Sequence, residues 1–354
     1  MSLRISGMGW VTPLGSGLED VWSRLSNGEK AVTESISSPL GNDYPVFRVP
    51  AAALAQAPAH PRLRRSSAIS RFAAVAGLSA LADAKVTLDE ETAARTALIF
   101  AVSNGGVIYT KRFYHDIVES GAQAASPLLF PETVFNAPAS HLAAILGIAG
   151  ASYTLVGDGA VGMLALKMAE DLLADKALDY CLVVGAEEAD WLLCDAYRNW
   201  RLLRSAPPIK PFQEPPRGMI LSEGAGAILL GRSGRVQVEK IAAGTNFRTQ
   251  REAGVCVEKV FSELCVTPPD FVAASANGTF IDEAERAAIS AHCPRAKVYS
   301  IKGALGESVG ASSFWQTICA AQFLGREGLR SAVVSTCGLN QQVAGLRLAL
   351  SPAA

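Results

Sequence analysis

Histidine is scarce in this chain of 354 residues, which holds only four, and no two of them are spaced as a pair of metal ligands. The seven cysteines are an odd number, scattered without any C-x-x-C spacing, and several lie inside apolar runs. These absences argue against a zinc site and against a disulfide framework. We expect free, buried thiols in a reducing compartment, no metal and no cofactor.

Long apolar runs and long basic runs are also absent. No stretch reaches the roughly 18 to 20 apolar residues that a membrane span needs, and the N-terminal residues lack the apolar core of a secretory signal. The charges balance, with 32 Lys and Arg against 33 Asp and Glu. We therefore expect no membrane span, no nucleic-acid partner and a cytoplasmic location.

A glycine-rich corner in the middle of the chain lacks a nucleophile. The β-prone residues 153–156 lead through Gly157, Asp158 and Gly159 into a segment that we expect to be helical to about residue 175. An apolar strand follows at residues 179–185. Such a corner exposes the free N–H groups at the start of a helix, where enzymes often place a nucleophile. No Ser, Cys or Thr stands at this apex.

The pattern of strands and helices occurs twice along the chain. It predicts two fused halves, residues 1–231 and 232–354, each with a mixed sheet, in a layered α/β/α/β/α duplication. Residues 31–66 and 191–216 are expected to be irregular. Strands are expected at 3–9, 96–102, 153–156, 179–185, 218–230, 236–243, 271–275, 297–301, 331–335 and 344–350, and the main helices at 18–26, 67–84, 137–146, 252–264 and 315–324.

Several ordered motifs carry a resemblance to a known family. Residues 5–22 look like its opening strand and turn, and Arg217-Gly218 followed by residues 223–226 (EGAG) is similar to its R-x-G-x-x-x-x-E-G-A-G signature. Residues 277–285 resemble H-G-T-x-x-x-D-x-x-E, and residues 300–311 resemble S-x-K-x-x-x-G-H-x-x-G-A. The chain thus resembles the β-ketoacyl-acyl-carrier-protein synthases of the thiolase superfamily. The resemblance implies an α/β thiolase-like fold.

The resemblance also locates a catalytic set that is mostly missing. The family uses a Cys at the corner and two His residues that stabilise the enolate formed by malonyl decarboxylation. These positions fall on Gly159, Asn277 and Glu307, and only Lys302 matches the family. The usual carboxylate partner of that lysine is Gln316 here, and the spacing permits Glu307 to take its place.

Two other residues are candidates for a substitute chemistry. Cys337 stands beside the family's gating loop, where thiolases place a catalytic cysteine, and Asp158 could act as a base. The alternative reading is that Cys337 is a small buried residue and that the carboxylates pair with Lys302. The loop itself, residues 338–343, has lost two hinge glycines and should move less freely.

Three residues are candidates for binding an acyl group. Leu339 and Asn340 lie on the gating loop, and Phe135, with Val134, would reach into the acyl tunnel of a partner subunit.

The resemblance leaves three functions open. The first is a non-catalytic subunit of the chain-length-factor type, which pairs with an active ketosynthase in type II fatty acid, polyketide or aryl-polyene biosynthesis and shapes its acyl tunnel. The second is an acyltransferase that acts on acyl-carrier-protein or CoA thioesters with a non-standard site. The third is an acyl-binding or carrier-protein-binding protein. The expected partners are a ketosynthase or a second copy of this chain, and an acyl carrier protein.

Overall fold

The structure is a computed structural model that describes residues 3–339 and 342–351. Its strands are β1 (Leu3–Thr12), β2 (Gly15–Ser16), β3 (Thr33–Ser37), β4 (Asp43–Phe47), β5 (Thr96–Val102), β6 (Ser152–Val156), β7 (Tyr180–Glu187), β8 (Leu221–Ser222), β9 (Gly224–Gly231), β10 (Val236–Asn246), β11 (Phe271–Ala273), β12 (Lys297–Tyr299), β13 (Ser331–Cys337) and β14 (Gln342–Leu350). Its helices are α1 (Leu18–Ser26), α2 (Ala68–Ala84), α3 (Glu90–Ala94), α4 (Val107–Ser120), α5 (Ala137–Leu146), α6 (Val161–Leu172), α7 (Trp191–Asn199), α8 (Gln250–Leu264), α9 (Ile281–His292), α10 (Lys302–Leu305) and α11 (Ser312–Arg326). Short 3-10 helices, η1 (Ala51–Leu54), η2 (Pro61–Leu63), η3 (Ala122–Ala124) and η4 (Phe130–Thr133), connect some of them.

The duplication expected from the sequence is present in the strand order. In the first half, β5 pairs in parallel with β6 and β7, and β9 joins β7 to β1 through antiparallel ladders. In the second half, β11, β12, β13, β14 and β10 repeat this arrangement. The two sheets also hydrogen-bond to each other, because residues 3–5 of β1 pair with residues 236–238 of β10. The division at residue 231 falls between β9 and β10 and stays a prediction as a domain boundary.

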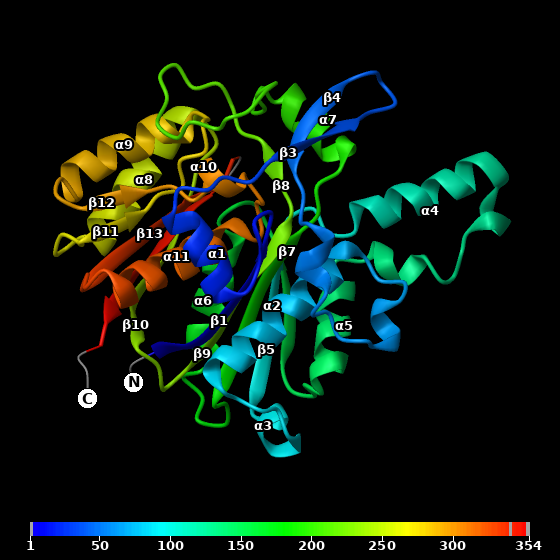
Figure 1. The fold of residues 1–354 in the computed structure, drawn as a ribbon, viewed down its shortest axis with the longest axis horizontal. Coiled ribbons are helices and arrows are strands. Elements are labelled where there is room, and N and C mark those ends of the chain that lie inside the picture. Colours follow the sequence, from blue (N-terminus) through cyan, green and yellow to red (C-terminus); the bar gives the residue numbers. More distant parts are fainter. Residues whose placement is uncertain (1–2, 340–341, 352–354) are drawn as a thin grey trace.

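Helices form three of the five layers, and the sheets of the two halves form the other two (Figure 1). Helices α2 and α5 cover the outer face of the first half, α8 and α9 cover that of the second, and α6 and α11 lie between the halves. Successive side chains of β5 point to opposite faces of the sheet, and helices cover both faces, which explains why nearly the whole strand is apolar and all of it is buried. Ile99 belongs to the central cluster, whereas Leu98 and Phe100 pack under α2 and α5. The predicted strand at 96–102 and the predicted five-layered α/β fold are confirmed.

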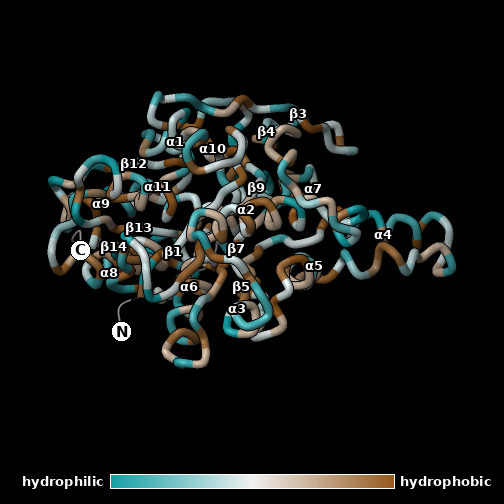
Figure 2. Tube along the Cα trace, turned by 60° about the horizontal axis from the view of Figure 1, so that its bottom comes forward, coloured by the Kyte–Doolittle hydropathy of each residue, from teal (hydrophilic) through white to brown (hydrophobic). Residues whose placement is uncertain are grey.

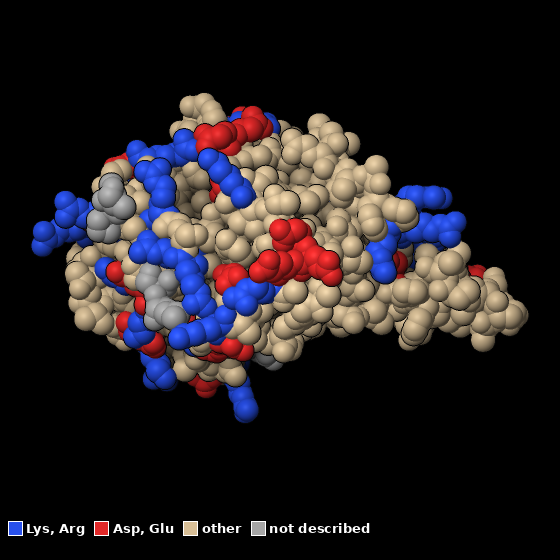
Figure 3. Space-filling view, turned by 90° about the horizontal axis from the view of Figure 1, so that it is seen from below, with Lys and Arg blue, Asp and Glu red and all other residues tan. Residues whose placement is uncertain are grey.

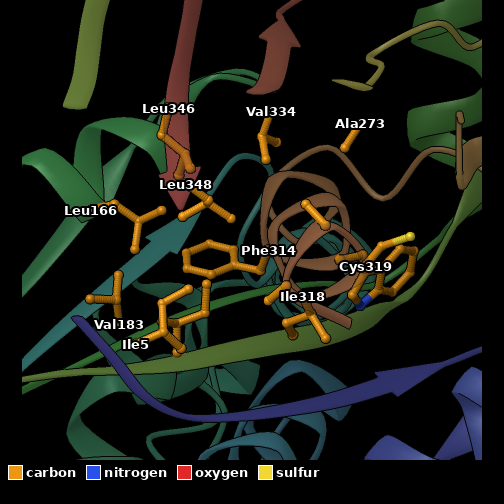
Figure 4. Close-up of a cluster of buried hydrophobic side chains, with 14 of the residues drawn as sticks. Ile5, Leu166, Val183, Ala273, Phe314, Ile318, Cys319, Val334, Leu346 and Leu348 are labelled. Atoms are coloured by element: carbon orange, nitrogen blue, oxygen red, sulfur yellow. The ribbon is translucent and has the colours of Figure 1, made fainter. Parts of the chain in front are cut away.

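The central layer is held by close contact between α6 and α11. A Cβ atom on Gly162 would overlap the Ser313 hydroxyl and lie 2.7 Å from the Phe314 ring. Figure 4 shows Phe314 and Ile318 of α11 among side chains from both sheets. Only a glycine at position 162 permits this approach, which fixes the N-terminus of α6 beside the second half.

Two segments expected to be irregular contain regular structure. Residues 33–47 form the hairpin of β3 and β4, which pairs with β8 and buries Val46 and Phe47. Pro45 concealed this strand in the sequence, but β4 pairs with β8 only at residues 46 and 47, outside the proline. Residues 191–199 form α7, whose first turn is capped by the Asp190 side chain, which accepts a hydrogen bond from Leu192 N at 3.0 Å.

Helix α4 projects from the body of the molecule (Figures 1 and 2), and none of its residues is buried. In Figure 3 this projection carries little charge, whereas Lys and Arg gather over the opposite end of that face. Strand β6 lies at the outer edge of the first half's sheet and pairs only with β5 among the described strands. Large apolar side chains are exposed in this region: Tyr114, Val118, Leu128, Phe130, Val134, Phe135, Tyr153 and Val156.

Candidate functional site

Three of the four predicted family positions meet in the second half of the molecule. Asn277 follows β11, Lys302 begins α10 and Glu307 comes just after it. The Lys302 Nζ atom lies 2.7 Å from Glu307 Oε2, and Asn277 Nδ2 donates to the same oxygen at 2.8 Å. All three residues are buried. The pairing of Glu307 with Lys302 that the spacing permitted is therefore confirmed.

The Glu307 carboxylate is held in its ionised form. Burial by itself would raise its pKa, but the Lys302 ammonium and the hydrogen bonds from Lys302 and Asn277 outweigh burial and hold the pKa of Glu307 below its usual value. The second oxygen accepts a hydrogen bond from Val309 N at 3.0 Å. A carboxylate with these partners is a weak base, and it places a negative charge at the position where the family has a proton donor.

Ser275 extends this network toward the corner. Lys302 Nζ donates to the Ser275 hydroxyl at 3.2 Å, and that oxygen also accepts from Cys337 N at 3.0 Å. The network thus connects α10 with the end of β13. Ser275 belongs to none of the sequence motifs. Only its position two residues before Asn277 could have indicated that it takes part in this network.

Gly159 lies just before the first turn of α6, as the corner pattern predicted. A Cβ atom built on it would stand 3.4 Å from Gly338 Cα and 3.6 Å from the Cys337 carbonyl oxygen, which are ordinary contact distances. A small side chain would therefore fit at this position. Ser275 accepts a hydrogen bond from the N–H of the same Cys337, so the corner and the buried network both contact the end of β13.

Asp158 stabilises the turn beside Gly159. Its Oδ1 atom accepts a hydrogen bond from Ala160 N at 3.2 Å, and its carboxylate packs so closely on Gly338 that a Cβ there would overlap it. Asp158 also lines a cavity at the corner. These contacts describe a helix-entry residue, and the structure adds no observation in favour of a base.

Cys337 is buried beside this wall, and its thiol donates to the Gly338 carbonyl at 3.6 Å. Burial, together with nearby carboxylates, raises the pKa of the Cys337 thiol well above its usual value. A nucleophilic cysteine needs a lowered pKa, because the thiolate is the reactive form. The geometry therefore favours the reading of Cys337 as a small buried residue.

A cavity of about 290 Å³ opens at the corner, between α7 and the loops of both halves. Leu339 lines it and also lines a neighbouring hollow of about 410 Å³ with Phe247, Arg248 and Phe280, and its role in acyl binding stays a prediction. Phe135 does not line either space: its ring packs against Gly105, where a Cβ would lie 2.5 Å from it. Asn340 lies outside the described residues. The first cavity is lined mainly by Ser103, Asn104, Asp158, Tyr197, Val309 and Leu339.

A buried acid supports one side of this cavity. Both Ser103 N and Asn104 N donate to the Glu187 carboxylate, which ends β7. Burial raises the pKa of Glu187 to about 8 despite these hydrogen bonds. Glu187 was not among the site residues predicted from the sequence. Its position could have been noticed, because Glu187 is a charged residue at the end of an otherwise apolar strand, directly after Gly185 and Ala186.

A duplicated five-layered fold, with a strand-to-helix corner packed on the end of β13 and a buried lysine connected to that strand end through Ser275, defines this chain as a thiolase-like protein. Within that class, the chain belongs to the beta-ketoacyl synthase family, because the family model "Beta-ketoacyl synthase, N-terminal domain" matches residues 2–234.

Relatives and solved structures agree with this assignment. Nodulation protein E of Rhizobium leguminosarum bv. trifolii is 25% identical over 232 residues, which cover 64% of this chain and 57% of that protein. The 3-oxoacyl-[acyl-carrier-protein] synthase 2 of Coxiella burnetii is 23% identical over 347 residues, or 89% of this chain and 83% of that protein. The aligned region thus spans little more than half of the first relative's length and most of the second's.

The fold is shared with ketosynthases that have a chain length factor. The ishigamide ketosynthase/chain length factor matches with a TM-score of 0.86 at 18% identity, covering 99% of both chains. A ketosynthase in complex with its chain length factor from Xenorhabdus doucetiae matches with a TM-score of 0.78 at 16% identity, covering 99% of this chain and 98% of that one. At these identities the likeness shows the fold.

Residues 3–339 and 342–351 contain no helix that is both long and apolar enough to cross a bilayer. The same residues contain no group of three or more His, Cys, Asp or Glu side chains that could hold a metal ion.

Proposed function

We propose that this chain is a non-catalytic subunit of the chain-length-factor type, which pairs with an active ketosynthase and shapes its acyl tunnel in fatty acid, polyketide or aryl-polyene biosynthesis. The observation that carries the proposal is the buried group of Lys302, Glu307 and Asn277. The charges of Lys302 and Glu307 neutralise each other, and Asn277 donates its hydrogen bond to Glu307, so these polar groups are already engaged within the chain and are not aimed at a substrate.

The arrangement opposes the family's chemistry at each step. Condensation begins with a thiolate at the corner, and Gly159 offers no side chain. Decarboxylation builds negative charge on an enolate oxygen, which needs a donor aimed at it. Asn277 gives its amide hydrogen bond to Glu307 instead, and the ionised Glu307 would repel both the enolate and a malonyl carboxylate.

The edge of the first half supplies a surface for a partner chain. Strand β6 presents an open edge, and Tyr153 and Val156 on it are 42% and 53% exposed. Val134 and Phe135, and Tyr114 and Val118 of α4, are further exposed apolar residues of the first half. An open apolar strand edge favours pairing with another chain. These exposed apolar side chains beside an unpaired strand edge support assembly with a ketosynthase or with a second copy.

The identity of the partners is part of the proposal. Solved relatives include a ketosynthase with its chain length factor and an acyl-carrier protein with its ketosynthase. By analogy, we assign this chain a ketosynthase partner, an acyl carrier protein that visits the complex, and a cytoplasmic location. Phe135 would then face the partner's acyl tunnel once β6 pairs across the interface.

The test is co-expression of this chain with a cysteine-containing ketosynthase from the same organism, followed by measurement of the mass of the complex. A one-to-one complex is the expected result. Val156→Asp places a charge on the β6 edge and should abolish the complex, whereas Val255→Asp, at an exposed position of α8 on the other half, should leave it intact. Self-association only, unaffected by Val156→Asp, would contradict the proposal.

A second measurement separates this function from an acyltransferase. The isolated chain should release no free thiol from acyl-carrier-protein or CoA thioesters above the uncatalysed rate. Turnover that is lost in Cys337→Ala would contradict the proposal and support the substitute chemistry instead.

A further inference from the structure

Two of the seven cysteines meet at the ends of neighbouring helices. Cys265 directly follows α8 and Cys293 directly follows α9, and the two helices pack side by side on the outer face of the second half (Figure 1). The two Sγ atoms are 3.2 Å apart, within hydrogen-bond distance for thiols. The residues are 28 positions apart in the chain, so their meeting results from the fold and not from a local motif.

The pair is buried but lies close to the surface. Cys265 is 7% exposed and Cys293 is 1% exposed, while the residues that follow them, Val266 and Pro294, are exposed. Cys265 is therefore the more accessible of the two sulfurs.

The surroundings favour a thiolate at Cys265. The hydrogen bond between the two thiols lowers the pKa of the Cys265 thiol, and the Arg347 guanidinium contributes in the same direction. Arg347 is held in place there, because Nη1 donates to the carbonyls of Leu264 and Thr267 on either side of Cys265. The same contact, together with burial, raises the pKa of the Cys293 thiol.

We propose that Cys265 and Cys293 form a reversible disulfide that links the ends of α8 and α9. A disulfide bond is about 2.05 Å long, so the two sulfurs have to approach by roughly 1 Å, which side-chain rotation at two helix ends can supply. This inference goes beyond the proposed function and does not depend on it.

The reaction uses a small-molecule disulfide, such as oxidised glutathione, as the oxidant. The Cys265 thiolate attacks one sulfur of that disulfide, which forms a mixed disulfide and releases one thiolate of the reagent. Cys293 then loses its proton and attacks the Cys265 sulfur, which releases the second. In total, the two protein thiols lose two electrons and two protons, and the reagent disulfide becomes two thiols.

The bond would restrain the segment that carries the candidate site. Residues 266–292 include β11, Ser275, Asn277 and all of α9, so a link between Cys265 and Cys293 closes a loop around them. Closing such a loop restricts the unfolded chain. We expect the oxidised protein to melt about 5 °C above the reduced one.

Cys256 supplies a matched control. It lies on α8 with the same exposed fraction of 7%, but its thiol donates to the Asn246 carbonyl at 3.4 Å. Cys256→Ser should thus leave disulfide formation unchanged, whereas Cys265→Ser and Cys293→Ser should each abolish it.

The experiment is equilibration of the purified chain with oxidised glutathione, followed by alkylation of the remaining thiols under denaturing conditions and mass spectrometry. The expected result is five alkylated cysteines out of seven, a loss of two hydrogen masses, a peptide link between Cys265 and Cys293, and reversal by dithiothreitol. Seven alkylated cysteines, a persistent glutathione adduct on Cys265, or a link between other cysteines would overturn the proposal. The readout uses the isolated chain, so failure here leaves the partner experiment unaffected.

Discussion

The carboxylate of Glu307 lies 2.7 Å from the ammonium of Lys302, and each side chain is only 3% exposed. Removing two charges from water is costly, and their attraction repays that cost only if the remaining hydrogen-bond capacity is also used. Asn277, Val309 N and Ser275 meet that requirement. The site is thus a closed structural unit, in which each member depends on the others.

Glu307→Gln should destabilise the protein by roughly 3–5 kcal/mol, because it leaves the Lys302 charge buried without a counter-charge. Urea unfolding followed by circular dichroism measures this free energy. The double variant Lys302→Met with Glu307→Gln removes both charges and should be less destabilised than Glu307→Gln alone. Equal stability of wild type and Glu307→Gln would show that the pair is not the structural unit described above.

Glu187 should make stability depend on pH. Its pKa is about 8 in the folded chain, above the ordinary value of 4.5 that it regains on unfolding. The folded state therefore holds this proton more tightly, and the contribution is fully present below about pH 4.5 and is lost as pH rises through about 8. The advantage of wild type over Glu187→Gln should fall by up to a few kcal/mol between pH 5 and pH 8.

The matching control for that series is Glu119→Gln, at an exposed position of α4. It should follow wild type at every pH. Parallel stability curves for wild type and Glu187→Gln would show that Glu187 ionises in the folded chain as it does in the unfolded one.

Gly162→Ala should destabilise the protein by about 1–3 kcal/mol, because the new methyl group overlaps Ser313 and Phe314 at the contact between α6 and α11. Gly254→Ala, in α8, has open space around its Cβ position and should stabilise the protein by up to about 1 kcal/mol. Thermal or urea unfolding of the two variants gives both values. A stable Gly162→Ala variant would mean that the two central helices are not in the close contact described.

Gly159→Cys should fold with a melting temperature within about 2 °C of wild type, because its Cβ meets only ordinary contacts. All seven native thiols are buried, whereas Gly159 is partly exposed, so the variant should show one fast-reacting thiol with iodoacetamide. Asn277 and Glu307 still oppose decarboxylation, and no condensation should follow. Condensation by Gly159→Cys alone would contradict the role given to Glu307.

Local patterns predicted much of the fold. An uninterrupted apolar run marked β5, and the Gly157-Asp158-Gly159 turn marked the start of α6. The repeated order of elements indicated the duplication. Strand β4 was missed because Pro45 is typical of loops. Helix α7 was missed because the prediction relied on periodic apolar residues, whereas the start of this helix is marked by the capping residue Asp190.

Contacts within the site could be predicted only between residues that are close together in the sequence, because such residues are also close in the folded chain. Lys302 and Glu307 are five residues apart in the chain, one at the start of α10 and the other just after its end, so their pairing could be anticipated. Ser275, Glu187 and the meeting of Cys265 with Cys293 depend on segments that fold together from distant parts of the chain. The place of Phe135 in a partner's tunnel depends on a second chain and stays a prediction.

The measurement that tests the central claim most directly is malonyl-carrier-protein condensation by the complex of this chain with its ketosynthase. We expect activity that disappears when the ketosynthase's own nucleophilic cysteine is replaced by alanine and persists when Lys302→Met and Glu307→Gln are combined in this chain. Condensation by this chain alone, or by a complex whose ketosynthase lacks its cysteine, would show that this chain is itself a catalyst.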